Sequence, residues 1–119
     1  MSSNAAAGLM AIEADREFFA KSGQLPAAWN DIRRFPRFYL RGEALAHVEP
    51  PYGDGEAETL AILTCDVSRS GVGIVSPRQL FPDQRLELQM PAGPSYCLKT
   101  IWCRRIEAGR YAVGCAFVE

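Results

Sequence analysis

Three arginines lie within five residues, in the stretch RRFPR at positions 33–37. The formal net charge of the 119-residue chain is only −1, so this local positive charge is not part of a generally basic surface. The planar fork of an arginine fits the oxygens of a phosphate, which makes Arg33 and Arg37 candidates for holding an anion. Arg34 has two interpretations, as an auxiliary phosphate contact or as a solvated side chain.

A second stretch, DVSRSGVGI at positions 66–74, places Asp66, Ser68 and Gly71 in the spacing D-x-S-x-x-G. Such a stretch is commonly only a turn, in which Asp or Ser accepts a backbone hydrogen bond. A carboxylate can also accept hydrogen bonds from the donors of a ligand, and a serine hydroxyl can bond a phosphate or an amine. The glycine leaves room for a ligand or for a tight turn. The same residues are therefore candidates for a ligand site.

Together, R-x-x-x-R and D-x-S-x-x-G resemble the PilZ domain family, bacterial receptors for the second messenger cyclic di-GMP. The C-terminal sequence TIWCRRIEAGRYAVGCAFVE is similar to the final hairpin of that family, with its tryptophan, its glycine turn and its closing G-x-x-F. The resemblance covers about residues 32–118. It implies that cyclic di-GMP is bound by five residues: Arg33, Arg37, Asp66, Ser68 and Gly71.

The resemblance also implies how such a receptor works. In the family, the arginine-bearing segment is mobile when empty and wraps the nucleotide when occupied, which changes a surface that a protein partner contacts. Some family members bind no nucleotide, so a protein-interaction adaptor is the alternative function. The sequence contains no glycine-rich phosphate loop, nucleophile elbow or HExxH motif, so we do not expect an enzyme. We expect no metal site and no cofactor besides the ligand.

The elements that must position these residues are mostly strands. Two-residue alternation predicts that five side chains of the first strand share one face: Phe38, Leu40, Ala44, Ala46 and Val48. Further strands are predicted over 59–67, 72–76, 85–90, 96–106 and 110–118, separated by turns rich in Gly, Ser and Pro. Six closely spaced strands without intervening helices indicate a mainly β fold, a small six-stranded antiparallel barrel of the split-barrel, PilZ-like type.

The N-terminal part of the chain has a different pattern. Residues 4–22 are rich in alanine and predict a helix that Gly23 ends. We therefore divide the chain into an N-terminal helix and connector at 1–31 and a barrel domain at 32–119. The helix has an apolar stripe that could cover the barrel or form a homodimer, made of Leu9, Ile12 and Phe19.

Composition narrows the partners and the compartment. A balanced charge excludes the broad basic surface that long nucleic acids require, and no apolar run is long enough for membrane insertion. The four cysteines lack CxxC spacing, so we expect reduced thiols in buried strand positions and a cytoplasmic protein. His47 is expected on the surface. Trp29 could stack on a guanine or pack the connector against the barrel, and Trp102 could border the site or simply belong to a barrel strand.

Overall fold

The computed structural model describes residues 16–25, 35–53 and 55–118. Within these ranges the chain forms one short helix and six strands. They are α2 (Arg16–Ala20), β1 (Phe38–Val48), β2 (Glu58–Val67), β3 (Gly71–Ser76), β4 (Arg85–Gln89), β5 (Ser95–Glu107) and β6 (Arg110–Phe117). Among these elements, no helix is long and apolar enough to cross a membrane.

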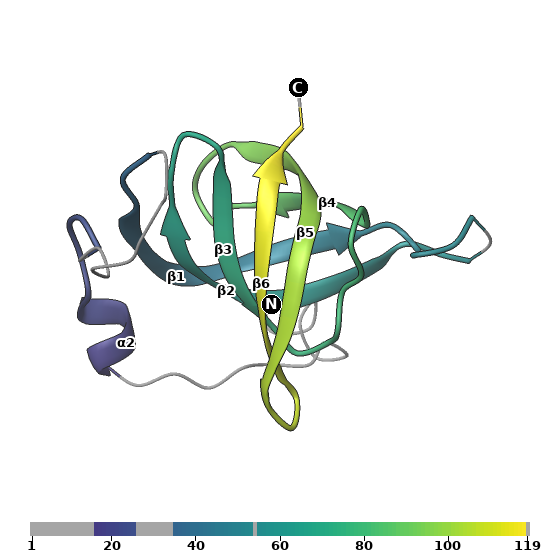
Figure 1. The fold of residues 1–119 in the computed structure, drawn as a ribbon, viewed down its shortest axis with the longest axis horizontal. Coiled ribbons are helices and arrows are strands. Elements are labelled where there is room, and N and C mark those ends of the chain that lie inside the picture. The colour runs from purple at the N-terminus through teal and green to yellow at the C-terminus, as the bar shows by residue number, and fades with distance from the viewer. Residues whose placement is uncertain (1–15, 26–34, 54, 119) are drawn as a thin grey trace.

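The six strands form a closed barrel in the order β1-β2-β3-β6-β5-β4, with every neighbouring pair antiparallel (Figure 1). The pairing of β1 with β4 closes the sheet, so that neither strand remains as an open edge. The predicted fold, a small six-stranded antiparallel barrel with an N-terminal helix, is confirmed.

The interior is filled by alternate side chains of all six strands. Its buried members include Ala44, Ala46, Val48, Leu60, Ile62, Val72, Ile74, Leu86, Leu88, Leu98, Val113 and Cys115. The predicted alternation of the first strand therefore holds from Ala44 onward. Phe38 shares this face, because it is paired with Val67, which packs against the core, but it lies at the first position of β1 and is 45% exposed. A bulge between Tyr39 and Gly42 shifts the pairing of β1 with β2 but keeps the alternation along β1, since Tyr39 and Arg41 are in contact on the opposite face.

Helix α2 lies beside β1, and Arg41 is the centre of their contact. The guanidinium of Arg41 lies 4.4 Å from the ring centroid of Phe18 and 5.0 Å from that of Tyr39. Phe18, and not the predicted Phe19, supplies this contact, because Phe19 lies edge-on against Phe18 with much of its ring exposed. The earlier part of the predicted helix, with Leu9 and Ile12, lies outside the described residues.

The connector after α2 pairs with the beginning of β1. Gln24 forms an antiparallel bridge with Phe38. The N–H of Leu25 donates to the carbonyl of Arg37 at 2.8 Å, and that of Tyr39 donates to the carbonyl of Gly23 at 2.7 Å. These bonds place residues 23–25 beside residues 37–39 at the beginning of β1.

Candidate functional site

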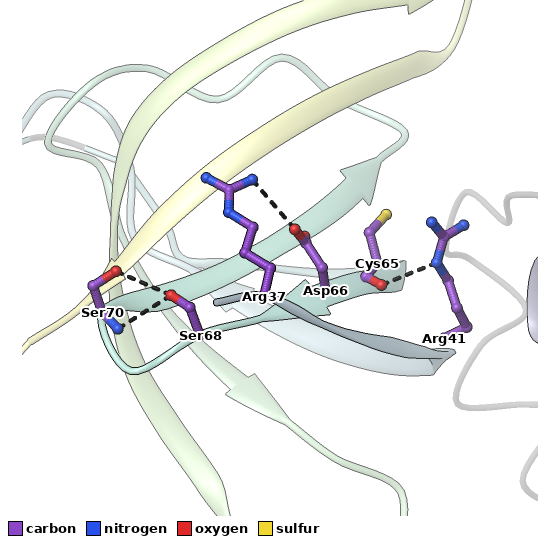
Figure 2. A network of polar contacts seen from close by, with 6 residues as sticks. All are labelled: Arg37, Arg41, Cys65, Asp66, Ser68 and Ser70. Atoms are coloured by element: carbon purple, nitrogen blue, oxygen red, sulfur yellow. Dashed lines mark hydrogen bonds and ion pairs between the residues drawn. The ribbon is translucent and has the colours of Figure 1, made fainter. Parts of the chain in front are cut away.

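The D-x-S-x-x-G motif forms the hairpin between β2 and β3. The N–H of Ser68 donates to the carbonyl of Gly71 at 2.9 Å, which closes the turn. Inside the turn, the N–H of Ser70 donates to Oγ of Ser68 at 3.2 Å, and the two hydroxyl oxygens are 3.0 Å apart (Figure 2). The hydroxyl of Ser68 thus orders the turn while lying at the surface of the barrel.

Gly71 lets β3 approach β6 closely. A Cβ atom on this residue would overlap the backbone carbonyl oxygen of Cys115. Its pairing partner on β6 is Ala116, and its backbone does not have a positive φ. A glycine is therefore required here because β3 and β6 lie close together, which could not be read from the sequence.

Arg37 and Asp66 connect the two motifs. Nη1 of Arg37 donates to Oδ2 of Asp66 at 3.3 Å (Figure 2). The side chain of Arg37 remains 39% exposed, whereas that of Asp66 is 11% exposed. Two of the residues predicted for the site are thus in direct contact, one accessible to a ligand and the other held against the barrel.

The carboxylate of Asp66 lies on the outer face of the sheet, over Gly73 of β3. A Cβ atom on Gly73 would collide with Oδ1 of Asp66. In the strand register, Asp66 is opposite Gly73, Gly73 is opposite Gly114, and Gly114 is opposite Trp102. Each of the two glycines therefore leaves room for a neighbouring side chain: the carboxylate of Asp66 lies over Gly73, and the indole of Trp102 lies over Gly114.

These residues line an open pocket of about 280 Å³ on the outside of the barrel. Arg37, Asp66 and Ser68 line one part of it, and Ile101 and Trp102 line another. The Trp102 side chain is 43% exposed, and its indole occupies the space that a side chain at Gly114 would need. A cation, a carboxylate, a hydroxyl and an aromatic ring thus surround one surface pocket.

Trp102 and Ile101 were not among the predicted site residues. A bulge on β5 between Thr100 and Trp102 places Trp102 opposite Gly114, so that the indole lies over this glycine. The tryptophan and the glycine of the G-x-x-F segment are both visible in the sequence, but their pairing depends on this bulge. Arg33 and Arg34 lie outside the described residues, so the first arginine of R-x-x-x-R remains a prediction.

Cys65 also borders the pocket, next to Asp66. Its carbonyl oxygen accepts a hydrogen bond from Nε of Arg41 at 2.9 Å. Burial raises the pKa of the Cys65 thiol from 9.0 to about 11, so this group is neutral at physiological pH. A neutral thiol adds no negative charge beside the carboxylate.

Of the remaining cysteines and the histidine, only Cys115 is among the residues that line the pocket. Cys115 is buried as predicted, but Cys97 is exposed, so the prediction of four buried thiols is wrong for it. The ring nitrogens of His47 lie 2.9 Å from Oγ1 of Thr59 and 2.9 Å from Oε1 of Gln89, which occupies both of them. Among the residues that the structure describes, no group of three His, Cys, Asp or Glu side chains could hold a metal ion.

A small antiparallel barrel with an arginine and a carboxylate at an outer pocket is the framework of a ligand-binding domain. Residues 31–119 match the model of the PilZ domain family, and the chain belongs to this family. PilZ domains are typically non-enzymatic receptor domains that bind cyclic di-GMP and interact with proteins. No curated protein matches the chain in a comparison of sequences.

Proposed function

We propose that this chain is a bacterial receptor for cyclic di-GMP that transmits ligand binding to a protein partner. The observation that supports this most directly is the contact of 3.3 Å between Arg37 and Asp66 at the edge of the outer pocket. These side chains come from the two motifs whose residue types suit a guanine nucleotide. In a PilZ domain, their meeting at one pocket favours a nucleotide receptor.

Each group at the pocket has a distinct task in the proposed complex. The fork of Arg37 binds a phosphodiester or the O6/N7 edge of a guanine. Asp66 accepts hydrogen bonds from the donor edge of a guanine, and Ser68 bonds a phosphate or an amine. The exposed indole of Trp102 offers a face on which a base can stack. Arg33 would supply a second fork, with Arg34 as an auxiliary phosphate contact.

Ligand binding has to replace the ion pair between Arg37 and Asp66, because both side chains also serve the nucleotide. The backbone carbonyl of Arg37 accepts a hydrogen bond from the N–H of Leu25, at the beginning of β1. A ligand that captures Arg37 would therefore order the segment 33–37 against the pocket. We infer that a partner protein contacts the surface that this segment creates.

We propose that the chain acts by binding and not by catalysis. We also propose that the receptor works in the cytoplasm. The cysteines of the described residues are all free, which agrees with a reducing compartment. The alternative function, a PilZ-type adaptor that binds no nucleotide, would use the same barrel. The meeting of Arg37 and Asp66 at the pocket favours the receptor over this adaptor.

Calorimetric titration of the purified chain with cyclic di-GMP separates the two functions. We expect selective binding near micromolar affinity, equivalent to about −8 kcal/mol. GTP and cyclic AMP serve as controls that carry phosphate or a purine without two linked guanines. A folded sample that binds none of the three nucleotides would favour the adaptor.

A further inference from the structure

Arg69 joins the two motifs through a contact that neither motif specifies. It lies inside the turn of D-x-S-x-x-G, between Ser68 and Ser70. Its guanidinium carbon is 5.1 Å from the ring centroid of Phe35, the middle residue of RRFPR. A guanidinium over an aromatic face is attracted by the negative charge of the ring face. The stretch with the arginines is therefore attached to the barrel at Phe35 as well as at Arg37.

The turn that carries Arg69 is held by hydrogen bonds on both sides. Within the turn, Ser68 N–H donates to the carbonyl of Gly71 and Ser70 N–H donates to the hydroxyl of Ser68. Toward β6, the N–H of Phe117 donates to the carbonyl of Ser70 at 3.0 Å. Arg69 thus extends from a backbone that these hydrogen bonds hold in place, and its guanidinium lies over the ring of Phe35.

The two attachments differ in what a ligand does to them. Arg37 and Asp66 both line the pocket and would both exchange their ion pair for contacts with a nucleotide. Arg69 is not among the residues that line the pocket, and Phe35 carries no group that recognises a phosphate. Stacking of Arg69 on Phe35 is therefore compatible with an occupied pocket.

We propose that Arg69 is a positioning residue for the ligand site. By stacking on Phe35, it keeps residues 35–37 beside the pocket while Arg37 exchanges its contact with Asp66 for one with the nucleotide. This role rests on the proposed cyclic di-GMP binding. A contact of this kind at an exposed site corresponds to about two- to fivefold in affinity. Arg69 acts through Phe35 and does not touch the nucleotide.

The contact itself can be tested without ligand. In a protein with nitrogen-15-labelled arginine, the side-chain Nε–H resonance of Arg69 should be displaced by the ring current of Phe35. The variant Phe35→Leu should return this resonance to the position of a solvated arginine, whereas Phe35→Tyr should retain the displacement. A resonance that is the same in the wild type and in Phe35→Leu overturns the contact.

The positioning role is tested by titrating cyclic di-GMP into the wild type, Arg69→Ala, Phe35→Leu and the double variant. Each single variant should bind about two- to fivefold more weakly, and the double variant should lose no more than one of them. Phe35→Tyr should bind like the wild type. Arg85→Ala is the matched control, because Arg85 is an exposed arginine on β4, which does not line the pocket.

The outcomes separate this inference from the function on which it rests. A wild type that binds while Arg69→Ala binds equally well overturns the positioning role alone. Losses that multiply in the double variant overturn it too, because they show that Arg69 acts independently of Phe35. A folded wild type that binds no cyclic di-GMP overturns the proposed function together with the positioning role, while the resonance of Arg69 still reports on the contact.

Discussion

Arg37 and Asp66 are 29 positions apart in the chain, and the barrel brings their side chains to 3.3 Å. The ion pair holds both groups at the edge of the pocket. Because Arg37 is substantially exposed, solvent screens the pair, and under the proposed function a nucleotide would displace it at little cost.

Asp66→Ala tests the assignment of the carboxylate to the guanine edge. We expect this variant to bind cyclic di-GMP about tenfold more weakly, because a well-aligned pairing with a base edge is worth about 1–3 kcal/mol. Adenine lacks the N1–H and N2 donors, so the preference for cyclic di-GMP over cyclic di-AMP should also decrease. Calorimetric titration with both nucleotides measures the two effects.

The control for this variant is Glu87→Ala, which removes an exposed carboxylate from β4. It should leave both affinities unchanged. If Asp66→Ala weakened both nucleotides equally, Asp66 would act only through Arg37 and would not recognise the base.

At the scale of the elements, the strands follow from alternation and turn residues, but their bulges do not. The predicted strand 72–76 is observed as Gly71–Ser76, and 85–90 as Arg85–Gln89. The position of Trp102 was missed because a bulge in β5 reverses the inward face locally. The alternation along one strand cannot show whether that strand has an extra residue relative to the strand with which it pairs.

Gly71→Ala tests whether close contact of β3 with β6 explains the glycine of the motif. The added methyl group would overlap the carbonyl oxygen of Cys115, so the strands would have to separate. We expect the free energy of unfolding to decrease by about 1–3 kcal/mol, as for other overpacked positions. Denaturant unfolding measures this change.

Gly53→Ala is the matched control, because a Cβ atom there would meet no atom within 4 Å and the backbone lacks a positive φ. Its effect should remain within about 0.5 kcal/mol. Equal stability of the two variants would show that β3 and β6 can separate at no cost.

At the scale of the whole molecule, the core and the side chains of the candidate site lie on opposite faces of the sheet. Asp66 and Trp102 lie on the outer face, whereas Ile74 and Val113 belong to the interior. Ligand binding therefore need not open the core. The sequence was sufficient to predict the six-stranded barrel and the family, and it singled out Arg37 and Asp66, which the structure places in contact. The position of Trp102 beside them required the three-dimensional register.

The pH dependence of stability should reflect two buried thiols. Burial raises the pKa of Cys65 to about 11 and that of Cys115 to about 12, against 9.0 for an ordinary thiol. Above about pH 9 the unfolded chain loses these protons while the folded chain retains them, so the free energy of unfolding should fall as pH rises toward 11–12. Denaturant titrations between pH 7 and 11 measure this decline.

Cys115→Ala removes one of the two thiols and should make the decline shallower, whatever its effect on stability at pH 7. The exposed Cys97 provides the control, since Cys97→Ala should leave the decline unchanged. A decline that is identical in the wild type and in Cys115→Ala would contradict the contribution of the buried thiol.

The most direct test of the account is calorimetric titration of cyclic di-GMP into three proteins: the wild type, Arg37→Ala and Arg85→Ala. We predict that Arg37→Ala binds at least about tenfold more weakly, within the 1–3 kcal/mol of a bidentate arginine contact, and that Arg85→Ala binds like the wild type. Because Arg37 lies outside the core, its variant should keep the melting temperature of the wild type. Unchanged binding by a folded Arg37→Ala would show that the pocket beside Asp66 is not the nucleotide site.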